Sequence, residues 1–136
     1  MRYDELSVGQ SAEYSKAVTD ADVMTFAGIT GDFNPVHVDE AAAAKTRFGG
    51  RIAHGMLSAG LISAVIANQL PGAGSIYLTQ TLRFTAPVRI GDTVTVSVSV
   101  AELMPKKRVR LSTVCRNQKG ETVLDGEATV LVTDDQ

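Results

Sequence analysis

The feature that most constrains the fold of this chain is a helix-like segment, residues 56–67, that is apolar on nearly every side. Its apolar residues are Met56, Leu57, Ala59, Leu61, Ile62, Ala64, Val65, Ile66 and Ala67. A helix that is apolar all round is buried all round. The segment stops at Leu70-Pro71-Gly72, because proline and glycine cannot continue a helix. It is too short and too polar to span a bilayer, so the rest of the chain must surround it.

The second half of the chain supplies this cover as strands. Apolar and polar residues alternate strictly from Thr93 to Val100 and less strictly in the neighbouring segments, which is typical of half-buried strands. Short turn signals separate the segments, so we expect antiparallel neighbours. Strands are expected at residues 76–86, 93–100, 108–116 and 122–132, with a further one within residues 11–18.

Helix and strands together predict an α+β fold in which a curved antiparallel sheet wraps one long buried helix. This arrangement is the hot-dog fold. With 136 residues and no internal repeat or linker, the chain is expected to form a single domain over residues 1–136.

Two short helices are expected before the long one. Thr19 and Asp22 form a capping-box pattern for a helix ending at Gly28. Asp39 is positioned to cap a helix from Glu40 to Arg47, which would end at Gly49-Gly50. Residues 30–37 lie between them and contain glycine, asparagine and proline, so a loop is predicted there.

Composition excludes several classes of function. Hydrophobic residues make up 44% and charged residues 21% of the chain, which is an ordinary globular balance. A net charge of -2 gives no reason to expect a nucleic-acid partner. The N-terminus lacks the order of a signal peptide, and the lone Cys115 cannot form an internal disulfide. A cytoplasmic protein that does not bind membranes is therefore expected.

Cofactor and nucleophile motifs are also missing. Two histidines and one cysteine are too few for a four-ligand zinc site of these residues alone. The sequence contains no phosphate-binding loop, dinucleotide fingerprint or nucleophile elbow. Cys115 falls on the apolar face of a strand, where packing is expected rather than catalysis. No metal, flavin or nicotinamide cofactor is expected.

Asp32 and His37 remain as the main candidates for chemistry. On a regular helix their spacing would point the side chains apart, but Pro35 makes a continuous helix unfavourable and a turn allows them to converge. A carboxylate and an imidazole that face one point can hold a water molecule, take a proton from it and return one to a carbon. On spacing alone, an Asx-turn beside a surface histidine is the more common reading.

His54 and Gly55 lie at the start of the long helix. His54 either lines a site or closes the end of the helix, and the second reading is the more common for this residue type. The unpaired N–H groups and the dipole of a helix N-terminus favour negative charge, and Gly55 would allow a ligand close to the backbone. The alternative is that Gly55 only gives room for the chain.

Several basic residues are candidates for a phosphate contact. The run from Lys106 to Arg110 is typical of a solvated sheet face, and a contact with coenzyme A or an acidic carrier protein is the alternative. Lys45, Arg47 and Arg51 lie nearer in sequence to the predicted loop and compete for that role.

The segment from Phe26 to His37, which includes Gly31-Asp32-Phe33-Asn34-Pro35-Val36-His37, resembles the hydratase 2 motif of the MaoC-like proteins. That family includes the (R)-specific enoyl-CoA hydratases. Residues 52–56 and 70–78 resemble the short bacterial members that supply polyhydroxyalkanoate monomers, and the resemblance runs from about residue 7 to 132.

The resemblance implies a role for each matching position. Asp32 and His37 would bind and activate the hydrating water, and the Gly55 backbone N–H would polarise the thioester carbonyl. Ser63 resembles a family position near the catalytic aspartate, and Asn34 would shape the loop at the substrate site. The family also implies a hot-dog homodimer with its site near the subunit interface.

The expected reaction is reversible addition of water to a trans-2-enoyl-CoA, giving the (R)-3-hydroxyacyl-CoA. Coenzyme A is part of the substrate, and no separate cofactor is implied. Two alternatives stay open. One is another hot-dog thioester enzyme, either an acyl-CoA thioesterase or a carrier-bound hydroxyacyl dehydratase, because fold does not fix function. The other is a non-catalytic acyl-CoA-binding subunit.

Overall fold

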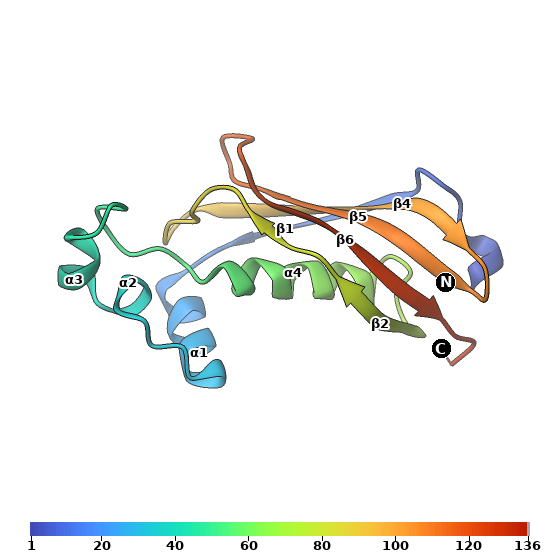
Figure 1. The fold of residues 1–136 in the computed structure, drawn as a ribbon, viewed down its shortest axis with the longest axis horizontal. Coiled ribbons are helices and arrows are strands. Elements are labelled where there is room, and N and C mark those ends of the chain that lie inside the picture. Colours follow the sequence, from blue (N-terminus) through green and yellow to red (C-terminus); the bar gives the residue numbers. More distant parts are fainter. Residues whose placement is uncertain (136) are drawn as a thin grey trace.

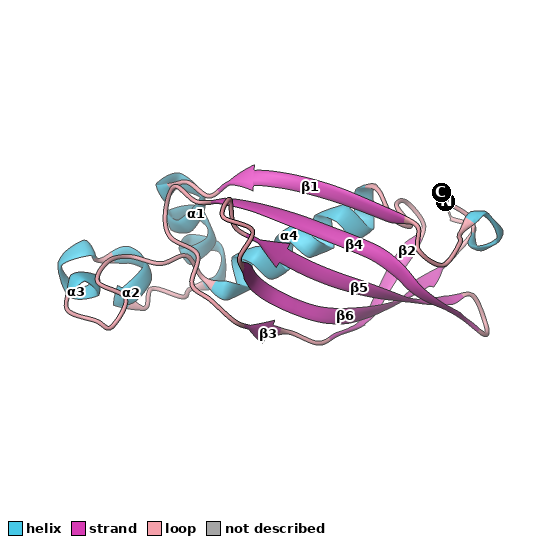
Figure 2. Cartoon of the chain, turned by 90° about the horizontal axis from the view of Figure 1, so that it is seen from above, coloured by secondary structure: helices cyan, strands magenta, loops and turns pink. Residues whose placement is uncertain are grey.

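A six-stranded antiparallel sheet forms one layer of the molecule in the computed structural model, which describes residues 1–135. The strand order is β1-β4-β5-β6-β2, and the short β3 also pairs with β6. Figure 1 shows the five longer strands, and Figure 2 also shows β3 next to β6. The strands are β1 Ser11–Ala17, β2 Ser75–Gln80, β3 Arg83–Phe84, β4 Thr93–Met104, β5 Arg108–Arg116 and β6 Thr122–Val132.

The long helix α4, Gly55–Asn68, lies along the sheet, as Figures 1 and 2 both show. Ile62, Val65 and Ile66 are buried and belong to one hydrophobic cluster with the inward-facing residues of the strands. In β4 these are Val94, Val96, Val98 and Val100, the set expected from the strict alternation. The predicted hot-dog fold is confirmed.

The prediction that the helix is buried on every side is wrong for the single chain. The sheet covers one side of α4, while Met56 remains 53% exposed and Gly60 and Ala67 are also exposed. Ile76 and Leu78 of β2 are exposed as well, at 47% and 43%. Apolar surface on α4 and β2 is therefore left uncovered by this chain.

The strand expected over residues 76–86 is interrupted. It forms β2 and β3, and residues 81 and 82 between them lie outside both strands. A Cβ added to Gly126 of β6 would lie 1.8 Å from the carbonyl oxygen of Thr81. Glycine at this position lets the interrupted backbone approach β6 closely.

Three short helices gather at one end of the sheet (Figure 2). They are α1 Asp20–Thr30, α2 Pro35–Val38 and α3 Glu40–Ala44, and a short 3-10 turn, Tyr3–Glu5, precedes β1. None of the helices in the described residues is long and apolar enough to cross a membrane.

The caps of these helices agree with the sequence, but their ends do not. The Thr19 and Asp22 capping box is present, and α1 continues past Gly28 to a left-handed Gly31. Asp39 caps α3, which ends before Arg47. The predicted loop contains one helical turn, α2, because Pro35 occupies its first position, where no N–H is needed.

The extended segment before α4 ties this end of the molecule together. The N–H of Ile52 donates to Val36 of α2 at 3.1 Å, and the N–H of Ala53 donates to Val88 at 2.7 Å. Ile52 also forms an isolated bridge with Arg89. These bonds hold α2, and with it His37, beside the N-terminus of α4.

Candidate active site

Asp32 and His37 are brought together at the end of the molecule where the short helices lie. Asp32 is exposed in the loop between α1 and α2, and His37 is half-buried on α2. A carboxylate oxygen of Asp32, a ring nitrogen of His37 and a ring nitrogen of His54 lie within 4.8 Å of one another. The site therefore joins three side chains rather than two.

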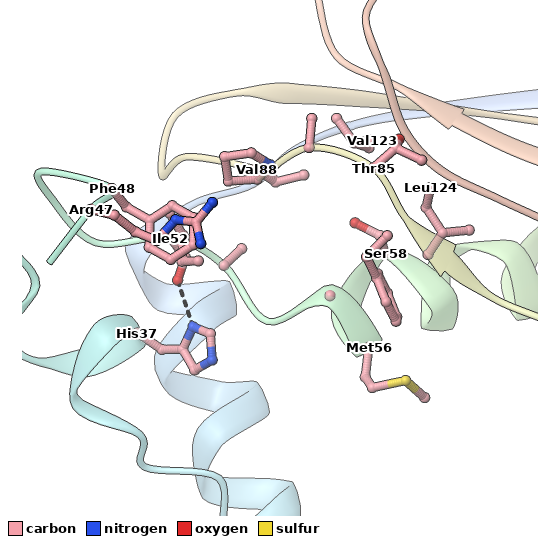
Figure 3. A pocket seen from close by; sticks show the side chains of 15 residues that line it. His37, Arg47, Phe48, Ile52, Met56, Ser58, Thr85, Val88, Val123 and Leu124 are labelled. Carbon is pink, nitrogen blue, oxygen red and sulfur yellow. Dashed lines mark hydrogen bonds between the residues drawn. The ribbon is translucent and has the colours of Figure 1, made fainter.

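The His37 ring is held in one orientation. Its Nδ1 lies 2.8 Å from the carbonyl oxygen of Ile52 (Figure 3). Because a carbonyl only accepts, Nδ1 carries the proton in this bond and Nε2 is the nitrogen left for a ligand.

Arg51 braces the same helix. Its Nε donates to the His37 carbonyl oxygen at 2.7 Å, and its guanidinium also pairs with Asp20 at 2.7 Å. The Arg51 side chain is only 14% exposed. Arg51 is thus occupied inside the protein, which removes it from the candidates for a phosphate contact.

The Asp32 loop is shaped by local hydrogen bonds. The Asp32 N–H donates to the Thr30 hydroxyl at 3.2 Å, and the Asn34 N–H donates to Asp32 Oδ1 at 3.2 Å. The Asn34 side chain accepts from the N–H of Val36 at 3.3 Å and caps α2. The Asx-turn expected as the alternative is present, and it coexists with the convergence of Asp32 and His37.

His54 lies closer to Asp32 and His37 than the sequence indicates. It is 2% exposed, its Nε2 lies 3.0 Å from the Asp32 carbonyl oxygen, and its ring centroid lies 3.9 Å from that of His37. Its position before a buried helix was the available signal, but the sequence does not show that the Asp32 loop folds over that helix.

The second ring nitrogen of His54 has no partner among the described residues. Its Nδ1 is buried, and residues 1–135 offer it no hydrogen-bond partner. Leaving a buried polar atom unsatisfied costs about 1–3 kcal/mol. Such an atom beside a reactive pair is typical of a site that receives water or a polar ligand group.

A cavity of about 440 Å³ opens beside His37. Gly55 lies at its wall, where α4 begins, and no side chain caps this helix. The Leu57 N–H donates to the His54 carbonyl oxygen at 3.1 Å, which leaves the N–H groups of Gly55 and Met56 without a partner among residues 1–135 and available to a ligand. The lining is mostly apolar and includes Ile52, Met56, Val88 and Leu124, which Figure 3 labels, together with Phe84.

Gly55 is required by packing. A Cβ at this position would lie 2.6 Å from the ring of Phe84, which extends from β3. The space that a side chain would need is taken by the Phe84 ring, which supports the reading in which Gly55 gives room for the chain. The approach of a ligand to the Gly55 backbone stays a prediction.

Ser63 lies apart from this cluster. It is half-buried on α4, about 12 Å along the helix axis from Gly55 at 1.5 Å per residue. Within the described residues it lines neither the cavity beside His37 nor a second cavity of about 670 Å³ next to Met56, Gly60 and Leu78.

The basic run has acidic partners at the opposite end of the sheet. Arg110 pairs with Glu102 and Glu127, and these neighbours raise the pKa of its guanidinium. Lys107 lies in the turn between β4 and β5 and pairs with Asp134. Figure 2 shows this turn far from α2 and α3. Arg47 is different, since it is exposed and lines the cavity that contains His37.

The donor types of Asp32, His37 and His54 would fit a three-ligand zinc site. Zinc bonds of about 2.1 Å would hold the donor atoms about 3.4 Å apart. A water with hydrogen bonds of about 2.8 Å separates its partners by about 4.6 Å. The observed spacing, which is at most 4.8 Å, is compatible with both arrangements.

Cys115 takes no part in this chemistry. It is fully buried, as expected, and burial raises the pKa of its thiol to about 12. A thiol with that pKa supplies almost no thiolate at neutral pH.

Comparison with known proteins identifies the family. Residues 5–130 match the model of the MaoC-like domain. The chain belongs to the MaoC-like family. The resemblance noted at residues 26–37 is thereby confirmed.

Relatives of this MaoC-like chain include hydratases and a dehydratase. A 3-hydroxybutyryl-CoA dehydratase from Methylorubrum extorquens is 53% identical, over 96% of this chain and 83% of that protein. An (R)-specific enoyl-CoA hydratase from Rhodospirillum rubrum is 51% identical, over 96% and 90%. The solved structure of the unliganded R-hydratase PhaJ1 from Pseudomonas aeruginosa superposes with a TM-score of 0.93 at 55% identity, covering 97% and 85%.

Proposed function

We propose that this chain is an (R)-specific enoyl-CoA hydratase, which adds water reversibly to a trans-2-enoyl-CoA. The observation that carries the proposal is the convergence of Asp32 and His37 within 4.8 Å, beside a cavity that begins at the open N-terminus of α4. The similarity to hydratases at about half identity over nearly the whole chain supports the same reaction.

In the proposed reaction a water molecule is bound between Asp32 and His37. Its oxygen forms a bond to C3 of the enoyl chain, one water proton passes to the pair, and a proton is delivered to C2. His37 Nε2 exchanges protons in this scheme, because Nδ1 is committed to Ile52. The negative charge that develops on the thioester oxygen is stabilised by the N–H of Gly55 at the positive end of α4.

The substrate proposed for this site is an acyl-CoA thioester. The apolar lining of the cavity suits an acyl chain, and Arg47 at the same cavity offers a guanidinium for a phosphate of coenzyme A. Asn34 acts through the shape of the Asp32 loop. Ser63 lies on α4 outside both cavities. It is proposed to contact the substrate only if the acyl chain extends along α4.

We further propose that the working protein is a homodimer. The exposed apolar residues on α4 and β2 are too numerous for a surface that faces only water. A second copy of the chain over this surface would complete the burial of α4 that its sequence demands. Location in the cytoplasm stays a prediction of the sequence.

Absorbance at the enoyl thioester band, with crotonyl-CoA as substrate, tests the reaction. The band should disappear without release of free thiol, because water adds to carbon and the thioester survives. Release of thiol would indicate a thioesterase. Saturable acyl-CoA binding without loss of the band, for crotonyl-CoA and a longer enoyl-CoA, would indicate a binding subunit and contradict the proposal.

A further inference from the structure

A buried histidine at the site has no task in the proposed reaction. His54 is 2% exposed and immediately precedes α4, yet its side chain does not cap the helix. Its polar contact goes to another part of the chain, 22 residues earlier in the sequence.

That contact is to the backbone of Asp32. His54 Nε2 lies 3.0 Å from the Asp32 carbonyl oxygen, and it must donate because a carbonyl only accepts. The other hydrogen bonds of Asp32 reach only Thr30 and Asn34, two residues away on either side. Among the described residues, the His54 bond is the one hydrogen bond from Asp32 to a distant part of the chain.

The same ring also contacts the histidine of the pair. The ring centroids of His54 and His37 are 3.9 Å apart with an interplanar angle of 30°, and the ring of Phe26 on α1 lies 4.7 Å away. His54 thus touches α1, the Asp32 loop and α2 from a fixed place at the start of α4.

We propose that His54 is the positioning residue that sets the Asp32 carboxylate against His37. It anchors an exposed loop through the Asp32 carbonyl and limits the tilt of the His37 ring by stacking. This inference rests on the proposed hydratase function. It keeps proton exchange with Asp32 and His37, while the His54 Nε2 proton stays in its bond to the Asp32 carbonyl.

Three substitutions separate positioning from packing. His54→Leu keeps an apolar side chain and removes the donor, and His54→Gln restores an N–H donor at a similar reach. Leu57→Ala is the matched control, because Leu57 is 8% exposed in the same turn of α4 and packs into the core. Circular dichroism establishes that each variant is folded.

Turnover of crotonyl-CoA gives the first readout. We expect His54→Leu to lower kcat by up to about 10²-fold with little change in KM, since misplacing a reacting group by about 1 Å costs that much. His54→Gln should recover a large part of kcat, while Leu57→Ala lowers Tm and keeps kcat. Wild-type kcat in His54→Leu, or equal losses in the Leu and Gln variants, would overturn the proposal.

Amide hydrogen exchange gives a readout that does not depend on the reaction. Residues 31–34 should exchange faster in His54→Leu than in the wild type, and not faster in Leu57→Ala. Unchanged exchange in His54→Leu would overturn the anchor whatever the activity. If the wild type does not hydrate enoyl-CoA, the proposed function is contradicted. Faster exchange of residues 31–34 in His54→Leu would still support the anchoring role of His54.

Discussion

At the scale of single residues, the site depends on which atoms are already engaged. His37 Nδ1 is bonded to Ile52 and Asp32 Oδ1 accepts the Asn34 N–H, so His37 Nε2 and Asp32 Oδ2 are the atoms left for a ligand among the described residues. The ordinary chemistry of a carboxylate and an imidazole at this spacing is proton exchange with a shared water.

Removing either member of the pair should therefore slow the reaction without unfolding the protein. We expect Asp32→Asn and His37→Gln each to lower kcat for crotonyl-CoA by about 10²–10⁴-fold. Glu40→Gln, a neutralised carboxylate on the nearby α3, should retain wild-type kcat. Full activity in both Asp32 and His37 variants would remove the pair from the mechanism.

Arg47 is expected to affect binding rather than chemistry. Arg47→Gln should raise KM for an enoyl-CoA roughly tenfold, because a hydrogen bond to a charged group contributes about 1.5 kcal/mol. The KM for the matching enoyl-pantetheine, which lacks the phosphates, should not change. Lys106→Gln, at the far end of the sheet, is the control. An equal rise in KM for both thioesters would show that Arg47 does not contact phosphate.

Much of the site was predictable at this scale, and its third side chain was not. Asp32 and His37 stand in a distinctive motif, and a loop containing proline was correctly expected to bring them together. Sequence alone could not reveal that His54 lies against this loop or that Arg51 is bonded internally. Both facts depend on how residues 51–54 cross from α3 to α4, which is a matter of tertiary packing.

At the scale of elements, the N-terminus of α4 and the cap of α1 are the informative places. Gly55 at the start of α4 is closely approached by Phe84, so this position is sensitive to one added methyl group. α1 begins in a capping box to which Lys16 of β1 adds a charge.

Gly55→Ala should impair the site through Phe84. The added Cβ would displace the Phe84 ring within the cavity, and we expect kcat/KM to fall by up to about 10²-fold. Gly55→Ala combined with Phe84→Leu should recover activity, because the smaller side chain can yield. Gly28→Ala in α1 meets nothing within 4 Å and is the control. No loss in Gly55→Ala would refute the importance of this contact.

The α1 cap should make stability depend on pH in acid. The Lys16 ammonium and the Thr19 N–H lower the pKa of Asp22 below its ordinary value of 3.8. The charged carboxylate therefore contributes stability that is present above that value and is lost as the pH falls through the lowered pKa. The difference in free energy of unfolding between wild type and Asp22→Asn, measured by urea titration, should be constant near neutrality and shrink below about pH 4. A difference that does not change with pH would contradict this account.

At the scale of the whole molecule, the sequence pattern predicted more burial of α4 than a single chain provides. The periodicity predicted the sheet and its central helix, and the caps predicted where the short helices begin. The same reasoning placed all of α4 in the interior, yet the sheet of one chain covers only one side. The periodicity of apolar residues predicts which residues are buried. It does not show whether the same chain or a second copy covers them.

The uncovered surface predicts the assembly. Leu78→Asp should shift the protein from dimer to monomer in sedimentation equilibrium, because a buried unpaired charge is costly at an apolar interface. Val8→Asp alters a 64% exposed apolar residue near the start of the chain and should leave the dimer intact. A wild-type protein that sediments as a monomer would contradict the proposed homodimer.

The central claim is that Asp32 and His37 add water to an enoyl thioester with one stereochemical outcome. The most direct test is hydration of crotonyl-CoA coupled to an (R)-specific 3-hydroxyacyl-CoA dehydrogenase, with an (S)-specific enzyme in a parallel reaction. The account predicts reduced nicotinamide only in the (R)-coupled reaction for the wild type, and a rate lowered by about 10²–10⁴-fold for Asp32→Asn. Product in the (S)-coupled reaction, or an undiminished rate in Asp32→Asn, would contradict it.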